Sequence, residues 1–372
     1  MLYPYKTVPI FKKNIWGGNN LKRLGKKAPN QNIAESWELS TFPENESLIA
    51  NGPAKGRSIK ELIDKYSYNI LGADLIKRIV NKNHAPFLLK FLDANDKLSI
   101  QVHPTDDYAF SFENGQLGKT EMWYIIEAKP QAYVFHGLND CFSINDVKEA
   151  INKNKVENIF RKVPVKKGDV VYIPAGTVHA LNEGIVVAEI QQHSNLTYRL
   201  YDYNRVDKNG NKRQLHLNKA LDVLSLKNIK PLFTGLKIDY RNYQAEYLAL
   251  TNIFCVRKIK TNGKTIYFAT ENTFHSFMIL EGEAEFISKK ISTIGQKLET
   301  VIIPAGLKYC YISGKFEALN VFVPNPALSQ NILNGLNSHY SINEIYNNIA
   351  GITDLKLFDH HFTTPSEFIS KK

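Results

Sequence analysis

The stretch Leu98-Ser-Ile-Gln-Val-His-Pro104 alternates polar and apolar residues. This period of two is typical of a β-strand, and it places Ser99, Gln101 and His103 on one face with two apolar residues on the other. Polar side chains that face a barrel interior are costly unless something satisfies them, and a bound cation is one solution. The stretch therefore predicts a strand that carries a candidate metal site.

Short runs rich in Val, Ile, Tyr and Phe recur along the chain, separated by Gly, Pro, Asn and Asp. The clearest are residues 97–103, 122–128, 132–136, 169–174 and 186–192. They predict an all-β sandwich or barrel. Helices are predicted after the capping-box sequences that begin at Ser58, Ser143 and Ser341, and over residues 217–226. We therefore expect a β core decorated by helices.

Two sequence blocks recur in the same order in the second half of the chain. Ile173-Pro-Ala-Gly176 returns as Ile303-Pro-Ala-Gly306, and Trp123-Tyr-Ile-Ile-Glu-Ala128 is echoed by Phe277-Met-Ile-Leu-Glu-Gly282. Two matching blocks in one order indicate an internal duplication. The repeat therefore predicts two β-barrels of one kind.

The polar positions beside these blocks differ between the two copies. His179, three places after the first Gly, is replaced by Tyr309, and Glu121, two places before Trp123, is replaced by His275. The first copy therefore keeps a polar site that the second copy has changed.

The length of 372 residues suggests two or three domains. We predict an N-terminal catalytic domain over residues 1–235, a degenerate barrel over 236–328 and a C-terminal extension, helical in character, over 329–372. No apolar run of about 18 residues is present, so no membrane span is expected. The N-terminus lacks the features of a secretory signal. Three widely spaced cysteines favour a reduced, cytoplasmic compartment.

The formal net charge is +11. A basic surplus is compatible with nucleic acid, an anionic membrane or an anionic small substrate. Nucleic-acid binders tend to concentrate their charge on one stripe or tail, whereas the lysines here are scattered. The charge thus gives no reason to expect a nucleic-acid or membrane partner, and the oligomeric state is open.

Four polar residues on the predicted strands could together bind a metal ion. Gln101, His103, Glu121 and His179 offer an amide oxygen, two imidazoles and a carboxylate. This set suits a borderline divalent ion, with zinc as the first candidate. A set without cysteine that leaves room for water is typical of a catalytic site. Lys119 shares the strand face of Glu121.

Six blocks carry a resemblance to a known family: Ile15-Trp-Gly-Gly18, Glu35-Ser-Trp-Glu38, Leu98-Ser-Ile-Gln-Val-His-Pro104, Gly118-Lys-Thr-Glu121, Ile173-Pro-Ala-Gly-Thr-Val-His179 and Tyr198-Arg-Leu-Tyr-Asp-Tyr203. In their order and spacing the chain resembles the type I phosphomannose isomerases, in particular their short bacterial branch. The resemblance covers about residues 4–326. It implies a mainly β, tandem cupin fold, that is, two jelly-roll barrels with decorating helices.

The resemblance also implies an activity and a set of site residues. The activity is the interconversion of mannose 6-phosphate and fructose 6-phosphate by an aldose–ketose isomerase, within carbohydrate metabolism. One zinc ion per chain is implied, in the first cupin only, with the family's ligands falling on Gln101, His103, Glu121 and His179. The catalytic arginine falls on Arg199, and Lys119 matches a lysine that lines the active site. Ser99 and Arg205 stand where the substrate phosphate is held, although Arg205 replaces a lysine.

Isomerisation moves a proton between C1 and C2 through an enediolate. Arg199 would stabilise the developing oxyanion but cannot readily act as the base, because a guanidinium stays protonated. Lys119, water at the metal and a histidine remain candidates for the base. Alternation places Arg199, Tyr201, Tyr203 and Arg205 on one face, which suits a phosphosugar. In the competing interpretation, the two arginines merely pair with Asp202 or Asp207.

Two other functions remain open. The first is another cupin metalloenzyme, such as an iron dioxygenase. The second is a sugar-binding cupin without turnover, although a site that has lost its activity tends to lose residues such as His103, Glu121, His179 and Arg199. Metal analysis and a turnover assay separate these functions.

Overall fold

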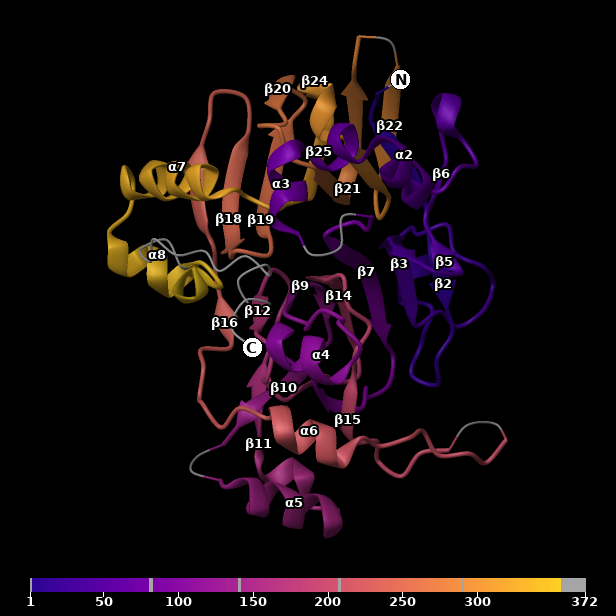
Figure 1. Cartoon of the computed structure of the whole chain (residues 1–372), viewed down its shortest axis with the longest axis vertical. Coiled ribbons are helices and arrows are strands. Elements are labelled where there is room, and N and C mark those ends of the chain that lie inside the picture. Colours follow the sequence, from indigo (N-terminus) through magenta and orange to yellow (C-terminus); the bar gives the residue numbers. More distant parts are fainter. Residues whose placement is uncertain (1, 80–82, 140–141, 207–208, 290, 356–372) are drawn as a thin grey trace. The chain divides into compact units, whose positions relative to one another are not determined.

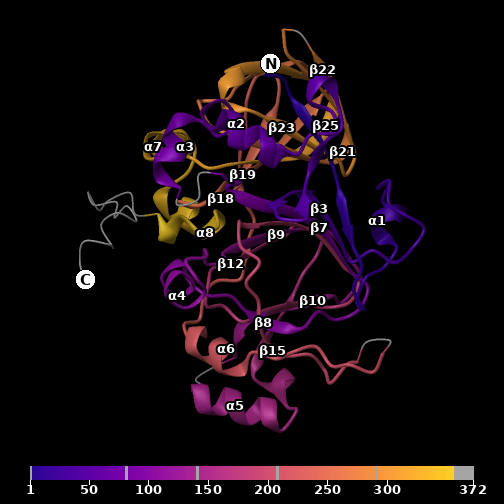
Figure 2. The same cartoon turned by 45° about the vertical axis from the view of Figure 1, so that its right-hand side comes forward.

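The computed structural model describes residues 2–79, 83–139, 142–206, 209–289 and 291–355 (Figures 1 and 2). The chain forms two compact units, each assembled from separate segments. We call Phe11–Trp37 with Phe87–Phe233 the first barrel. We call Met1–Ile10, Glu38–Pro86 and Thr234–Lys372 the second barrel. Within the described residues, no helix is long and apolar enough to cross a membrane.

Two antiparallel sheets build the first barrel. One follows the order β16-β12-β9-β14-β7-β3-β2, with strands Leu232–Phe233, Val170–Ile173, Glu121–Ala128, Ile185–Gln192, Phe87–Ala94, Glu35–Leu39 and Ile10–Lys12. The other follows β11-β10-β13-β8-β15, with strands Phe160–Pro164, Tyr133–Leu138, His179–Leu181, Ile100–Val102 and Tyr198–Tyr201.

Side-chain alternation divides the apolar residues of these strands into two buried clusters. One cluster draws on both sheets and includes Trp123, Val134 and Val187. The other contains Ile100 and Val102 from β8, together with residues of helices α5 (Ile144–Asn152) and α6 (Leu217–Val223). Figure 2 shows these two helices beside β8 and β15. The alternation predicted for residues 98–104 is thereby confirmed, since the apolar face packs under helices and the polar face points the other way.

The remaining helices of the first barrel are α1 (Asn20–Arg23), α4 (Asp106–Phe112) and a 3₁₀ turn at Val156–Asn158. Helix α5 begins at a reciprocal capping box in which Ser143 and Asp146 bond each other's backbone N–H groups. Its buried face consists of Val147, Ala150 and Ile151. The predicted helix after Ser143 is thus confirmed, because its cap and its apolar spacing agree. The helix predicted over 217–226 is present but ends at Val223, and no side chain caps its first turn.

The second barrel has an eleven-stranded sheet along the path β17-β18-β19-β25-β21-β23-β1-β6, with β20, β22 and β24 joined beside it. Its strands are Leu236–Asp239, Gln244–Leu250, Cys255–Asn262, Lys315–Phe322, His275–Ile287, Thr300–Ile303, Tyr5–Val8, Leu48–Ile49, Ile266–Ala269, Ser292–Gln296 and Tyr309–Ser313. A hairpin of β4 (Thr41–Phe42) and β5 (Asn45–Glu46) accompanies them.

Among the residues that the structure describes, the helices of the second barrel are α2 (Ile59–Leu71), α3 (Ala73–Arg78), α7 (Pro326–Asn337) and α8 (Ile342–Asn348). Short 3₁₀ turns lie at Gly52–Ala54, Ala305–Leu307 and Ile352–Asp354. Helices α2 and α8 begin where the sequence predicted, with Ser58 and Ser341 as N-caps. Helices α7 and α8 pack on the barrel core through Ile332, Leu336 and Ile345.

The internal repeat is visible in the strand register. Glu121 on β9 lies opposite Ile173 on β12, and His275 on β21 lies opposite Ile303 on β23. Two barrels of one kind with decorating helices confirm the predicted fold class.

The compact units divide the chain differently from the predicted domains. The unit boundary after Phe233 lies near the predicted end at 235, but residues 1–10 and 38–86 pack with the C-terminal half. They do so because β1 pairs with β23 and with β6. The three-domain division, as a statement about independent folding, stays a prediction.

Candidate active site

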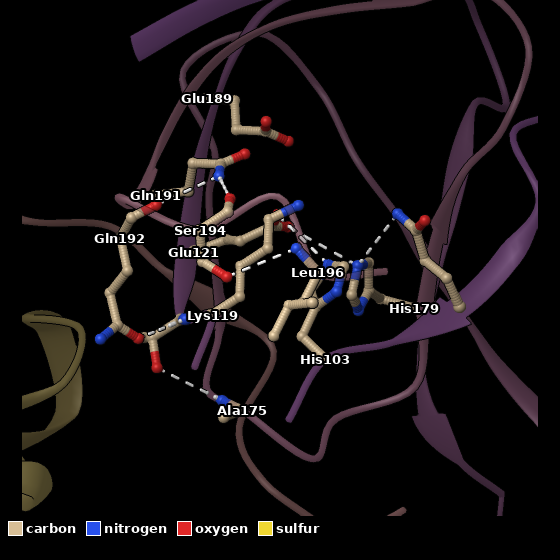
Figure 3. A network of polar contacts seen from close by, with 12 residues as sticks. His103, Lys119, Glu121, Ala175, His179, Glu189, Gln191, Gln192, Ser194 and Leu196 are labelled. Atoms are coloured by element: carbon tan, nitrogen blue, oxygen red, sulfur yellow. Dashed lines mark hydrogen bonds and ion pairs between the residues drawn. The ribbon is translucent and has the colours of Figure 1, made fainter. Parts of the chain in front are cut away.

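Three buried side chains meet inside the first barrel (Figure 3). His103 follows β8, Glu121 begins β9 and His179 begins β13. Each residue offers one ligand atom, and these atoms lie within 4.8 Å of one another. His103 Nε2 is 3.3 Å from Glu121 Oε1, and His179 Nε2 is 3.6 Å from Glu121 Oε2. The fold thus brings together three residues that are far apart in sequence.

The protonation states of this cluster follow from its surroundings. His179 Nδ1 is 2.8 Å from the carbonyl oxygen of Thr177, which can only accept, so Nδ1 carries the proton and Nε2 keeps its lone pair. Burial lowers the pKa of His103 to about 3 and also lowers the pKa of His179. Burial opposes ionisation of Glu121, but Lys119 and the two histidines hold its pKa well below the usual value. Two neutral imidazoles therefore face a carboxylate.

The cluster contains polar atoms that no described residue satisfies. Neither ring nitrogen of His103 and neither carboxylate oxygen of Glu121 has a hydrogen-bond partner among the described residues. Lys119 Nζ is 2.8 Å from Glu121 Oε1, close enough for an ion pair but not aligned for a hydrogen bond. Buried polar atoms without partners are expensive, and a cation would satisfy them.

The spacing of the donor atoms also fits a metal ion. Ligand atoms around a tetrahedral zinc, at bond lengths of about 2.0–2.2 Å, lie about 3.3–3.6 Å apart. Each histidine lies at about this distance from one carboxylate oxygen of Glu121, His103 from Oε1 and His179 from Oε2, and Gln101 Nε2 is 3.4 Å from His179 Nε2. Rotation of the Gln101 amide by half a turn would present its oxygen instead. The four predicted ligands are thus gathered at one place.

A cavity of about 140 Å³ adjoins the cluster. Gln101 and Lys119 line it, and both also contact the buried cluster. Its other lining residues are polar, charged or aromatic for the most part and belong to the first barrel; they include Trp16, Glu35, Trp37, Lys90, Ser99, Glu189, Asn195, Thr197, Arg199 and Arg213. A small polar molecule in this cavity would therefore reach the residues beside the cluster.

Arg199 lies in this cavity beside two other predicted residues. On β15 it is the register partner of Gln101, and its Nε donates to Ser99 Oγ at 3.2 Å. Its Nη1 donates to the carbonyl oxygen of Gln214 at 2.7 Å. Burial and the nearby Arg213 lower the pKa of Arg199, but a guanidinium stays charged near neutral pH.

The predicted alternation beyond Arg199 is wrong. A β-bulge shifts the register between Arg199 and Tyr201. Tyr201 and Tyr203 pack on the cluster beneath α5 and α6 instead of sharing the face of Arg199. The bulge accounts for Tyr201, whereas Tyr203 lies beyond the end of the strand, in a turn where its φ is 56°. Alternation in the sequence carries no sign of either feature.

Arg205 does not line the cavity. Its Nη2 donates to Asp202 Oδ1 at 2.6 Å, and its Nη1 donates to the carbonyl oxygen of Lys97. The same carboxylate binds Arg213, whose Nε is 2.8 Å from Asp202 Oδ2 and whose side chain does line the cavity. In this structure Arg205 therefore forms the ion pair with Asp202 that the competing interpretation of the sequence predicted. Asp207 lies outside the described residues.

A buried charge network beside the cluster was missed by the sequence reasoning. Lys90 Nζ is 2.9 Å from Glu189 Oε1 and 2.8 Å from Gln191 Oε1, and Glu35 is 3.6 Å away. Trp123 Nε1 donates to Glu189 Oε2 at 3.0 Å. The signal was present, since Lys90 interrupts the apolar run of residues 87–92 in strand β7, and a buried lysine needs a partner.

Comparisons with known proteins connect this geometry to a family. Residues 5–137 match the model of the phosphomannose isomerase type I catalytic domain. The mannose-6-phosphate isomerase ManA of Bacillus subtilis (strain 168) is 34% identical over 311 residues, which cover 84% of this chain and 96% of that protein. A mannose-6-phosphate isomerase of Streptococcus mutans is 33% identical over 311 residues, covering 82% and 94%.

A solved structure agrees with the sequence relatives. The mannose 6-phosphate isomerase crystal structure from Bacillus subtilis superposes with a TM-score of 0.78 at 33% identity, covering 86% of this chain and 99% of that one. The resemblance in the six sequence blocks is thereby confirmed. On these matches, the chain belongs to the type I phosphomannose isomerases, a family of metal-dependent isomerase enzymes.

Proposed function

We propose that the first barrel binds one divalent ion, with zinc preferred, and interconverts mannose 6-phosphate and fructose 6-phosphate. The observation that carries this proposal is the buried His103–Glu121–His179 cluster, whose unsatisfied donors adjoin a cavity lined by Lys119 and Arg199. Its relatives bear the name of this activity. Family membership favours the isomerase over the iron dioxygenase and over a sugar-binding cupin without turnover.

The proposed ligands are Gln101, His103, Glu121 and His179. Two imidazoles, a carboxylate and an amide oxygen form a set that zinc accepts, and the absence of a thiolate leaves the choice among borderline divalent ions to affinity and supply. When bound, the ion acts as a Lewis acid toward sugar oxygens and so stabilises negative charge that develops there.

Arg199 supplies a fixed positive charge on the cavity wall. Its two bonds, to Ser99 Oγ and to the carbonyl of Gln214, fix the plane of the guanidinium before a substrate arrives. A preorganised donor of this kind stabilises an oxyanion without the cost of reorientation. We assign it to the enediolate oxygen.

Lys119 and the phosphate end complete the assignment. Lys119 lines the cavity and contacts Glu121, so it remains a candidate to move the proton between C1 and C2. The predicted contact of Ser99 with the phosphate stays a prediction, because its hydroxyl accepts from Arg199 Nε and would bring the phosphate beside that arginine. The role of Arg205 at the phosphate stays a prediction, and Arg213, which lines the cavity, is the competing candidate. A remote phosphate contact would orient the reacting end of the sugar.

We also propose that the enzyme works in the cytoplasm. Cys255 and Cys310 are buried free thiols, which fits a reducing compartment.

The test is direct. Purified protein is incubated with mannose 6-phosphate, and fructose 6-phosphate is measured before chelation, after chelation and after zinc is restored. The proposal expects turnover, loss and recovery. Substrate binding without turnover in the zinc-loaded protein would favour the sugar-binding alternative, and iron with oxygen uptake would favour the dioxygenase.

A further inference from the structure

The two barrels place a cation at equivalent positions of their sheets. In the first barrel, Glu189 on β14 lies opposite Lys90 on β7 and opposite an indole on β9. In the second barrel, Asn320 on β25 lies opposite Arg257 on β19 and opposite a phenyl ring on β21. The register therefore equates Lys90 with Arg257, and the carboxylate of Glu189 with the neutral amide of Asn320.

The partners of Arg257 are neutral. Its Nε donates to Asn320 Oδ1 at 2.9 Å, and its guanidinium carbon lies 5.2 Å and 5.8 Å from the ring centres of Phe322 and Phe268. Its register partner on β18 is Tyr247, an uncharged side chain that also hydrogen-bonds the guanidinium. Among the described residues, no carboxylate oxygen lies within the 4.0 Å of an ion pair with Arg257.

The remaining polar group of this cluster adds no negative charge. His275 Nδ1 is 3.2 Å from Asn320 Nδ2, and His275 Nε2 is 3.0 Å from the carbonyl oxygen of Thr270. Burial, with the nearby Arg257, lowers the pKa of His275 to about 3, so the ring is neutral at physiological pH. The cluster as a whole thus carries the single positive charge of Arg257.

A partly buried cation without a counter-charge is only partly compensated by solvent, whereas Lys90 in the first barrel is paired with Glu189 and Glu35. The side chain of Arg257 is only half-buried, in contrast to that of Lys90, which is 5% exposed. A guanidinium presents a planar fork of donors that matches an oxyanion, and aromatic walls strengthen such a contact by excluding water.

We propose that Arg257 forms a second anion site, in which the second barrel binds a compact oxyanion such as the phosphate group of a metabolite. Arg257 supplies the charge and the donor fork, and Asn320 fixes the guanidinium through Nε. This site is independent of the isomerase site in the first barrel, because its residues belong to the second barrel. It remains valid whether or not the proposed isomerisation is confirmed.

Equilibrium dialysis with radiolabelled inorganic phosphate, at fixed ionic strength, counts the phosphate ions bound per chain. Two variants are compared with the parent. Arg257→Gln removes the charge, and Asn320→Glu restores the carboxylate that the first barrel has at Glu189. Both variants should bind phosphate at this site at least about tenfold more weakly than the parent. Arg257→Gln removes the charge-assisted bond, and in Asn320→Glu the new carboxylate pairs with the guanidinium and competes with phosphate.

Both variants should keep the isomerase activity of the parent, which also shows that they are folded. Arg257→Lys is a third variant that keeps the charge without the fork and should bind phosphate more weakly than the parent. Equal phosphate stoichiometry and affinity in the parent, Arg257→Gln and Asn320→Glu would overturn the proposal and leave Arg257 as a packing residue. Loss of the site in Arg257→Gln but not in Asn320→Glu would equally contradict it, since internal pairing should compete.

Discussion

The two barrels share a strand framework and differ in what their inward-facing polar atoms contact. Both ring nitrogens of His275 in the second barrel have a hydrogen-bond partner in the protein, whereas neither ring nitrogen of His103 in the first barrel makes a hydrogen bond to a described residue. In the same registers, Ala269 stands opposite Tyr309, where the first barrel pairs Gln101 with His179. The second barrel thus keeps its fold without the Gln101, Glu121 and His179 ligands of the first barrel. The unsatisfied polar atoms of the first barrel therefore indicate a ligand.

The largest expected difference between the barrels concerns His179 and its counterpart Tyr309. His179→Ala should lose bound metal, because the ion loses one of its proposed ligands. Turnover should fall by about three orders of magnitude or more, because the reaction requires the metal as a Lewis acid. Tyr309→Ala should keep parental metal content and parental turnover. Metal-to-protein ratios and initial rates measure both effects. A parental metal ratio in His179→Ala would overturn the ligand assignment.

The second difference concerns stability. Lys90→Met leaves Glu189 and Glu35 without their cation, so unfolding free energy should fall by about 3–5 kcal/mol. Arg257→Met should cost less, because its partner Asn320 is neutral. Urea unfolding compares the two variants directly. Equal losses would show that the charge network of the first barrel makes no special contribution.

Arg199→Lys isolates the geometry of the guanidinium. The charge is kept but the planar fork is lost, so kcat should fall by about two orders of magnitude, as when a fixed oxyanion donor is removed. KM should change little and metal content should stay normal, since Arg199 is not a ligand. A kcat within about threefold of the parent would remove Arg199 from the mechanism.

Arg205 and Arg213 make the smallest contrast. Changing the arginine that contacts phosphate to Ala should raise KM for mannose 6-phosphate by about 10- to 150-fold, the equivalent of about 1.5–3 kcal/mol, with little effect on binding of unphosphorylated mannose. The cavity lining favours Arg213, and the family resemblance favours Arg205. Measuring both sugars with both variants decides between them. Equal effects on the two sugars in both variants would show that neither arginine contacts the phosphate.

The sequence predicted the features that depend on local pattern. Alternation placed Ser99, Gln101 and His103 on one face, and capping boxes located α5 and α8. The bulge after Arg199 was not predicted, because an extra residue in a strand leaves the composition unchanged.

Contacts between distant strands were also beyond the sequence. The pairing of Lys90 with Glu189 spans strands β7 and β14, and the segments 1–10 and 38–86 join the second barrel through β1 and β6. Each of these depends on which strands become neighbours, a property of the whole fold.

The central claim is that one metal ion, held in the first barrel, supports the isomerase reaction. A metal-free sample titrated with zinc while mannose 6-phosphate turnover is followed tests it directly. Activity should rise linearly and level off at one equivalent of zinc per chain, while far-ultraviolet circular dichroism shows the same folded state throughout, because the barrel has its own apolar core. A break at two equivalents, or full turnover without metal, would contradict the account.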